Sequence, residues 1–257
     1  MPKRPMFDLS GQLALVTGSS RGIGYAAARA LGLQGATVVL NGRQADTLEA
    51  AAQTLRDQGI RAQILPFDIF DVDQAVAAVD TLREDAGKID IFFSNAGIQH
   101  RAPLLSFPHQ EFERIVSGNL TSQWALGRHI AAGMAERGYG RIIFTGSVTA
   151  LLGRPEVTAY TAAKAALHGL VRQWSAELSG SGITVNAIAP GYVKTELTRN
   201  LWGDTAFNAW LEERVPQKKW GDPDDIASAV VFMAARESRF VTGQVLAVDG
   251  GLSSCMM

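Results

Sequence analysis

In the stretch VTGSSRGIG, residues 16–24, three glycines separate a short apolar run from a helical pattern. Gly18, Gly22 and Gly24 give the spacing G-x-x-x-G-x-G, which differs from the common dinucleotide spacing G-x-G-x-x-G. Glycines let a backbone turn tightly and approach a bound group, and a helix N-terminus offers free N–H groups and a positive dipole. The stretch therefore predicts a strand–turn–helix unit that holds a pyrophosphate. A tight turn without a ligand is the alternative.

Similar short apolar runs recur along the chain, each ending at a polar residue or glycine. The runs lie at residues 13–18, 36–43, 62–69, 89–97, 140–147, 183–191 and 243–251. Such runs suit strands that are buried on both faces. Helical patterns separate them, for example at residues 24–35, 45–59, 72–87 and 224–238. The alternation predicts an α/β fold, a single-domain Rossmann-like doubly wound parallel sheet of about seven strands with helices on both faces.

No linker, repeat or low-complexity tract divides the sequence, so we expect one domain over residues 1–257. Residues 194–222 are weakly patterned and contain Trp202, Trp210 and Trp220. Because such sheets bind ligands beyond the carboxyl ends of their strands, this insertion is placed to cover a substrate. The alternative is a packed helical excursion with aromatic core residues.

The composition excludes several classes of protein. Apolar residues make up 47% and charged residues 19%, which indicates a globular rather than a disordered chain. A net charge of −1 gives no reason to expect a nucleic acid or a membrane as partner. Cys255 is the one cysteine, so a cysteine-based metal site is not expected, and we expect no bound metal. The N-terminal stretch MPKRPMFDLSGQ lacks the apolar core of a secretory signal, which favours a cytoplasmic location.

The end of the second run predicts the type of cofactor. An acidic residue in this region usually accepts hydrogen bonds from the ribose of NAD. The chain instead has Asn41, Gly42 and Arg43, and Arg21 lies in the glycine turn. Guanidinium groups pair with a 2′-phosphate, whereas a carboxylate repels it. The sequence therefore predicts NADP(H), although either arginine could be an ordinary surface charge.

Several motifs together resemble one enzyme family. TGSSRGIG, SNAG, Asn119, Ser147 and YTAAK appear in this order, followed by PGYVKT. Ser147 precedes Tyr160 by 13 residues. This arrangement resembles the short-chain dehydrogenase/reductases over essentially the whole chain. Ser94 departs from the pattern, because the family often has an asparagine there.

The resemblance implies a catalytic role for Asn119, Ser147, Tyr160 and Lys164. Tyr160 would be the general acid/base, and Ser147 would orient the substrate oxygen. A free tyrosine has a pKa of about 10, and a cation one helical turn away favours the phenolate. Lys164 would therefore lower the pKa of Tyr160 while also holding the nicotinamide ribose. Asn119 would help to hold the lysine through a water-linked proton path. Without the other motifs, the tyrosine and lysine would be an ordinary helix pair.

The resemblance also implies a set of cofactor contacts. Asp68 and Ile69 match positions that border adenine, and Thr195 matches a hydroxyl that binds the carboxamide. The expected cofactor-binding residues are Gly18, Ser20, Arg21, Gly22, Ile23, Gly24, Arg43, Asp68, Ile69, Asn95, Ala96, Gly97, Tyr160, Lys164, Pro190, Gly191, Val193 and Thr195.

Two arginines suggest an anionic substrate. His100 and Arg101 follow the fourth run, and Arg154 lies between Ser147 and Tyr160. Guanidinium groups bind carboxylates with two parallel hydrogen bonds. We therefore expect the substrate to contact Arg101, Ser147, Arg154 and Tyr160. The alternative is that the arginines form structural salt bridges, for instance with Glu156.

Longer stretches such as NAGIQHRAP and AFNAWLEERVPQKKWGDPDDIA resemble one subgroup of this family, the gluconate 5-dehydrogenases or 5-ketogluconate reductases. The resemblance implies an NADP(H)-dependent oxidoreductase that interconverts 5-keto-D-gluconate and D-gluconate, a small anionic polyhydroxy or keto acid. It also implies a homotetramer. An oxoacyl–carrier-protein reductase, another sugar or polyol dehydrogenase, and a non-catalytic NADP(H)-binding regulator are the alternatives.

Overall fold

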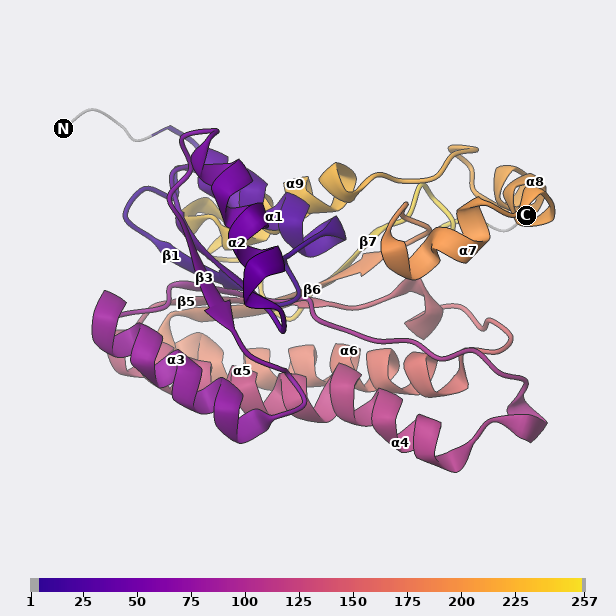
Figure 1. Ribbon diagram of the computed structural model, residues 1–257, viewed down its shortest axis with the longest axis horizontal. Coiled ribbons are helices and arrows are strands. Elements are labelled where there is room, and N and C mark those ends of the chain that lie inside the picture. The colour runs from indigo at the N-terminus through magenta and orange to yellow at the C-terminus, as the bar shows by residue number, and fades with distance from the viewer. Residues whose placement is uncertain (1–4, 256–257) are drawn as a thin grey trace.

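The structure is a computed structural model that describes residues 5–255 (Figure 1). Its strands are β1 (Leu13–Val16), β2 (Thr37–Gly42), β3 (Ala62–Pro66), β4 (Ile91–Ser94), β5 (Gly140–Thr145), β6 (Ile183–Pro190) and β7 (Val245–Val248). Its α-helices are α1 (Gly22–Leu33), α2 (Ala45–Arg56), α3 (Val72–Ala86), α4 (His109–Val116), α5 (Ser122–Arg137), α6 (Thr158–Leu178), α7 (Arg199–Trp202), α8 (Thr205–Arg214) and α9 (Pro223–Ala234). Short helical turns are η1 (Leu104–Ser106), η2 (Ser117–Thr121), η3 (Val148–Ala150), η4 (Ser179–Ser181), η5 (Glu196–Thr198) and η6 (Arg236–Ser238).

The strands form one parallel sheet in the order β3-β2-β1-β4-β5-β6-β7. Leu15 in β1 pairs with Val39 in β2 on one side and with Phe92 in β4 on the other. The strand order reverses between β1 and β4, which leaves a crevice beyond their carboxyl ends. The predicted doubly wound α/β fold is confirmed.

Helices cover both faces of this sheet (Figure 1). Helices α1, α2 and α9 pack on one face, and α3, α5 and α6 pack on the other. Alternate residues of a strand point to opposite faces, so Val38 joins the first core and Val39 joins the second. Since both faces are dry, the strands appear in the sequence as continuous apolar runs.

Several strands end before the carboxyl end of the apolar run that predicted them. The run at residues 62–69 is an example, because β3 ends at Pro66. β3 is an edge strand whose neighbour β2 ends at Gly42, so the chain beyond Phe67 has no partner for a ladder. The residues released in this way form loops at the carboxyl edge of the sheet.

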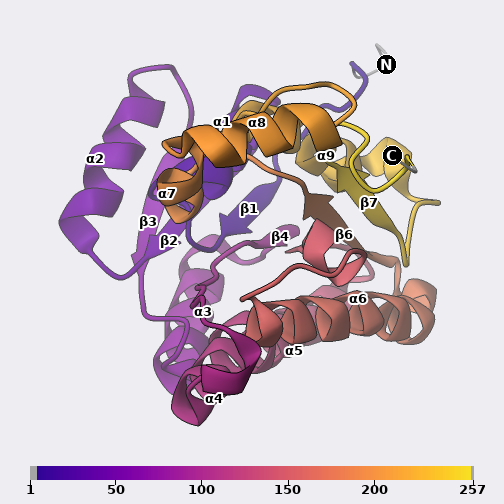
Figure 2. The same ribbon diagram turned by 90° about the vertical axis from the view of Figure 1, so that its right-hand side faces the viewer.

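The insertion at residues 194–222 leaves the sheet after β6 and returns through a parallel bridge between Val193 and Gly221. It contains η5, α7 and α8. Both views place α7 and α8, in orange, at the end of the molecule toward which β6 points (Figures 1 and 2). No helix within residues 5–255 has the length and apolar character that crossing a bilayer requires.

Candidate active site

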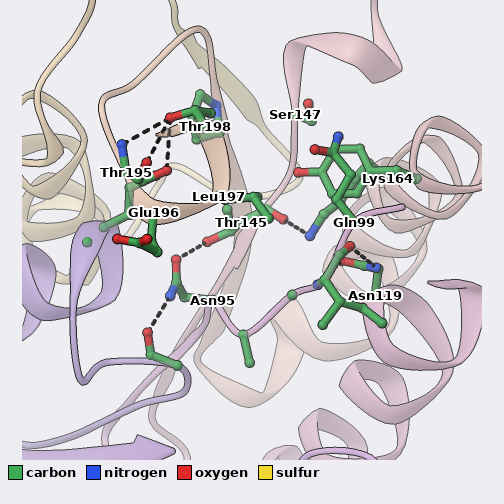
Figure 3. A pocket seen from close by; sticks show the side chains of 18 of the residues that line it. Asn95, Gln99, Asn119, Thr145, Ser147, Lys164, Thr195, Glu196, Leu197 and Thr198 are labelled. Atoms are coloured by element: carbon green, nitrogen blue, oxygen red, sulfur yellow. Dashed lines mark hydrogen bonds between the residues drawn. The ribbon is translucent and has the colours of Figure 1, made fainter. Parts of the chain in front are cut away.

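A cavity of about 640 Å³ opens at the carboxyl edge of the sheet. It is lined by the loops that follow β1, β2, β3, β4, β5 and β6. The residues predicted for the cofactor, for catalysis and for the substrate all line this cavity, with the exception of Gly24. The topology therefore gathers into one space residues that are far apart in the chain (Figure 3).

The glycine turn shapes one end of the cavity. Gly18 and Gly22 have positive φ angles of 61° and 59°, which favour glycine. Gly24 lies behind the lining, where a Cβ would approach the Asn95 side-chain nitrogen to 2.6 Å and collide with the Gly18 carbonyl. α1 begins here, and the side chain of its N-cap residue, Arg21, makes no hydrogen bond to the first N–H groups. The close backbone turn and these N–H donors fit a pyrophosphate.

Asn41 explains why the second strand lacks an acid at this position. Its buried side-chain oxygen accepts from the Gly18 N–H at 3.4 Å. Its side-chain nitrogen donates to the carbonyls of Leu65 and Phe67 at 3.0 and 3.2 Å. A carboxylate could not make these two donations. Arg21 and Arg43, in contrast, are exposed at the rim of the cavity.

Asn95 ties three strand ends together. Its side-chain oxygen accepts from the Thr145 hydroxyl at 3.1 Å (Figure 3). Its side-chain nitrogen donates to the carbonyl oxygens of Thr17 and Gly18, each at 3.1 Å. The ends of β1, β4 and β5 are thereby held in register around the cavity.

Gln123 on α5 accounts for Ser94, the departure from the family pattern. The Ser94 hydroxyl donates to the Gln123 side-chain oxygen. The Gln123 side-chain nitrogen donates in turn to the carbonyl of Ala96 in the cavity wall. Both side chains are buried. Ser94 and Gln123 therefore hold the loop after β4 in place against α5.

Ser147, Tyr160 and Lys164 converge on the cavity from the end of β5 and the first turns of α6. Figure 3 shows Ser147 and Lys164 on the same side of it. The Lys164 ammonium donates to the Thr145 carbonyl at 2.7 Å and lies 5.6 Å from the centre of the Tyr160 ring. The Ser147 hydroxyl oxygen accepts from the Thr149 N–H at 3.1 Å. These three side chains can present a hydroxyl, a phenol and an ammonium to one substrate oxygen and its surroundings.

The pKa of Tyr160 is raised, whereas the sequence analysis predicted that Lys164 would lower it. Burial raises the pKa of Tyr160 to about 12, and the hydrogen bond with Ser147 offsets only part of that increase. Burial also lowers the pKa of Lys164 to about 8. The charged forms of both groups lose water, and the ammonium faces the ring of Tyr160 while it donates to Thr145. Desolvation therefore exceeds the effect of the neighbouring cation.

Asn119 lies in η2, a π-helical turn between α4 and α5. Its side-chain oxygen accepts from the Ile98 N–H at 3.3 Å. Its side-chain nitrogen donates to the carbonyls of Ile98 and Ile115 at 2.8 and 2.9 Å. A Cβ on Gly97 would lie 2.8 Å from this oxygen and 3.9 Å from the Lys164 nitrogen. Asn119 therefore fixes the loop beside the lysine, and π-helical turns are frequent at functional sites.

His168 contacts Ser147 without lining the cavity, and the sequence reasoning missed it. It is 5% exposed, and its Nε2 accepts from the Ser147 N–H at 3.4 Å. Burial, aided by the charges of Lys164 and Arg172, lowers the pKa of His168 to about 4. The ring is therefore neutral at neutral pH. Its position four residues after Lys164, on the same helix face, was the signal that could have found it.

The two candidate substrate arginines lie close enough for their charges to interact. Burial and the charge of Arg154 lower the pKa of Arg101. Within residues 5–255 neither arginine forms an ion pair with a carboxylate, Glu156 included. Arg154 instead donates to the Tyr192 hydroxyl at 2.9 Å. His100 does not line the cavity, and its Nδ1 lies 3.5 Å from the Glu111 carboxylate.

The insertion divides into two parts. Thr195, Glu196, Leu197, Thr198 and Leu201 line the cavity. The aromatic residues of α8 do not line it and pack behind it against Tyr192 and Trp220. The segment that borders the cavity is therefore the chain from η5 into α7.

Comparison with known proteins agrees with this geometry. A family model described as enoyl-(acyl carrier protein) reductase matches residues 18–253. The chain belongs to the short-chain dehydrogenase/reductase family, a family of oxidoreductases. The resemblance noted in the sequence is thereby confirmed.

Relatives with assigned activities are similar over nearly the whole chain. The gluconate 5-dehydrogenase of Gluconobacter oxydans (strain 621H) is 41% identical over 248 residues, which cover 96% of this chain and 97% of the relative. The 5-keto-D-gluconate 5-reductase of Escherichia coli (strain K12) is 40% identical over 247 residues, with 96% and 97% covered. The crystal structure of a gluconate 5-dehydrogenase from Burkholderia cenocepacia J2315 in complex with NADP and tartrate has a TM-score of 0.95 at 41% identity, and 98% of each chain is covered.

Proposed function

We propose that this chain is an NADP(H)-dependent oxidoreductase that interconverts 5-keto-D-gluconate and D-gluconate. One observation carries the proposal. Arg101 and Arg154 line the same cavity as Ser147 and Tyr160, and within residues 5–255 neither arginine forms an ion pair with a carboxylate. The charge of Glu156 favours the charged form of Arg101 and so opposes only part of the effect of burial and of Arg154 on its pKa. A ketone that also carries a carboxylate matches this combination of groups. The names of the similar relatives support the same substrate.

The cofactor fits the residues at the other end of the cavity. The turn from Gly18 to Gly22 and the first N–H groups of α1 suit a pyrophosphate. The exposed guanidinium groups of Arg21 and Arg43 suit a 2′-phosphate. The similar crystal structure in complex with NADP supports this choice. When bound, the nicotinamide ring supplies or accepts the hydride.

Tyr160, Ser147 and Lys164 then provide the proton transfer and position the substrate and cofactor. Because burial holds the pKa of Tyr160 near 12, its phenol stays protonated at neutral pH and can donate to the oxygen of a ketone as that oxygen gains charge. The Ser147 hydroxyl donates a hydrogen bond to the same oxygen. Lys164 keeps donors free beyond its bond to Thr145, and these can hold the nicotinamide ribose.

The remaining parts of the proposal concern the surroundings of the site. The chain forms a single catalytic domain in which the segment from Thr195 to Leu201 covers the substrate. Leu105 and Phe240 are 100% and 99% exposed, and Trp124 is 40% exposed. We propose a homotetramer, as the family resemblance implies, and these exposed apolar side chains are candidates for its contacts. The cytoplasmic location stays a prediction from the sequence.

Steady-state assays with NADPH and NADH test the proposal. The substrates are 5-keto-D-gluconate, a neutral ketose and an acetoacetyl thioester. We expect turnover of 5-keto-D-gluconate with NADPH, and a loss in kcat of about 100-fold or more for Tyr160→Phe with NADPH binding retained.

Each contrary outcome selects an alternative. Turnover of the thioester without turnover of 5-keto-D-gluconate would favour an oxoacyl–carrier-protein reductase. NADPH binding without turnover of any carbonyl compound would favour a regulator. Undiminished activity of Tyr160→Phe would refute the role of the tyrosine, and a strong preference for NADH would refute the role of Arg21 and Arg43.

A further inference from the structure

Arg154 sits in an aromatic cage formed by Tyr192 and Phe207. The guanidinium carbon lies 5.1 Å from the centre of each ring. The two rings contact each other edge to face, with centres 5.2 Å apart. The guanidinium also donates to the Tyr192 hydroxyl at 2.9 Å. Three separate contacts therefore set the position of this one side chain.

The cage comes from two distant parts of the chain. Tyr192 follows β6 and lines the cavity, whereas Phe207 lies on α8 and does not line it. Asp204 caps the N-terminus of α8, and its carboxylate accepts from the Phe207 N–H at 3.2 Å. Asn208 accepts from the indole N–H of Trp220 at 2.7 Å. α8 thus contacts the site through the Phe207 ring, which packs against Arg154.

Arg154 contacts two aromatic rings and forms no ion pair within residues 5–255, although the charge of Arg101 lies close to it. Arg101 and Arg154 repel each other, and burial adds to the cost of the charge on Arg101. A carboxylate would relieve the repulsion but would also occupy the hydrogen-bond donors of the guanidinium. Ring faces attract the cation without neutralising it. The charge of Arg154 therefore stays available to a ligand in the cavity.

We propose that Tyr192 and Phe207 are specificity-determining positioning residues. They hold Arg154 toward the cavity as an unneutralised cation, and so set the preference for substrates with a carboxylate over neutral ones of similar size. The preference for anionic substrates rests on the proposed function, whereas the mechanical role of the cage does not.

Kinetics of Phe207→Leu measure the effect on specificity. The change keeps apolar bulk and removes the ring face. We expect the KM for 5-keto-D-gluconate to rise about threefold to tenfold with kcat little changed, and the KM for D-fructose, a neutral ketose, to stay the same. Phe207→Tyr keeps the ring face and should restore the wild-type KM.

Trp210→Leu is the matched control. The Trp210 ring packs on Phe207 and Tyr192, with centres 5.1 and 5.5 Å apart, and among the described residues it makes no ring contact with Arg154. We expect this variant to keep the ratio of the two KM values. Equal changes for both substrates, or equal effects of the Phe207 and Trp210 variants, would overturn the proposal and reduce the cage to helix packing.

Chemical modification tests the cage without any turnover. Phenylglyoxal modifies accessible guanidinium groups, and peptide mass mapping follows each arginine separately. We expect Arg154 to react at least about threefold faster in Phe207→Leu, with Arg101 unchanged. An unchanged modification rate of Arg154 in Phe207→Leu would refute the proposal that the cage positions Arg154. If the wild-type protein reduces no carboxylated ketone, the proposed function fails, and the modification rates still decide whether the cage holds Arg154.

Discussion

The Lys164 ammonium is anchored to the carbonyl oxygen of Thr145 by a hydrogen bond of 2.7 Å. This bond joins the catalytic face of α6 to the end of β5, two residues before Ser147. It restrains a side chain that is only 2% exposed, and burial lowers the pKa of that lysine to about 8. The lysine therefore changes its charge within an accessible pH range.

The affinity for NADPH should follow this titration. Lys164 is protonated below its pKa of about 8, and its charge is lost as the pH rises through that value. Because a charged donor binds more strongly than a neutral one, we expect NADPH affinity to fall about fivefold between about pH 6.5 and about pH 9.5. Fluorescence titrations measure the affinity. Lys164→Met should bind more weakly at every pH and show a flat profile, and a profile identical to that of the wild type would contradict the assignment.

Arg43→Ala should change the choice of cofactor. Arg43 is exposed at the rim of the cavity, where its guanidinium can pair with a 2′-phosphate. We expect kcat/KM with NADPH to fall about 10-fold to 100-fold and kcat/KM with NADH to stay nearly constant. Arg56→Ala is the control, because Arg56 pairs with Glu49 on α2 and does not line the cavity. Equal losses with both cofactors would argue against phosphate recognition.

Gly24→Ala should weaken both the fold and cofactor binding. The added Cβ would lie 2.9 Å from the Ser19 Cα and 2.6 Å from the Asn95 side chain, so the turn must shift. We expect the free energy of unfolding to fall by about 1–3 kcal/mol together with a loss of NADPH affinity. Urea unfolding and NADPH titration measure the two effects.

Gly59→Ala provides the comparison for that substitution. Gly59 has a φ of 78°, and nothing lies within 4 Å of the position that a Cβ would take there, so only backbone strain of about 1 kcal/mol is expected. The NADPH affinity of the Gly59→Ala variant should equal that of the wild type. If Gly24→Ala also kept full affinity, the turn would not need its close backbone approach.

His168→Gln should remove part of the acid sensitivity. The folded-state pKa of His168 is about 4, below its ordinary value of 6.5. As the pH falls from 6.5 toward 4, the unfolded chain gains a proton that the folded chain does not, so the free energy of unfolding falls by up to about 3 kcal/mol. Glutamine can still accept from Ser147 but does not titrate.

Urea unfolding at neutral pH and at about pH 4.5 compares the two proteins. Carboxylates contribute equally to both, so the difference isolates His168. The wild type should lose more stability on acidification than His168→Gln does. The same loss in both proteins would show that the imidazole is not held neutral.

Much of the fold and many residues of the cavity were predictable from local pattern. Apolar runs, glycine spacing and helical periodicity involve residues close together in the chain. They therefore favour the same local structure whatever the position of the segment in the fold. The parallel sheet then brings the carboxyl ends of its strands to one edge. For this reason Gly18, Asn95, Ser147 and Lys164 line one cavity, as their motifs predicted.

Other features depended on packing between segments far apart in sequence. Gln123 reaches Ser94, His168 accepts from Ser147, and Arg154 enters the cage of Tyr192 and Phe207. Helical spacing could have placed His168 on the same face as Lys164. No local pattern encodes its contact with Ser147 or the other two contacts, because each joins segments that are far apart in the sequence. The pKa of Tyr160 has the same origin. One nearby cation suggested a lowered value, whereas the removal of water by the assembled site raises it.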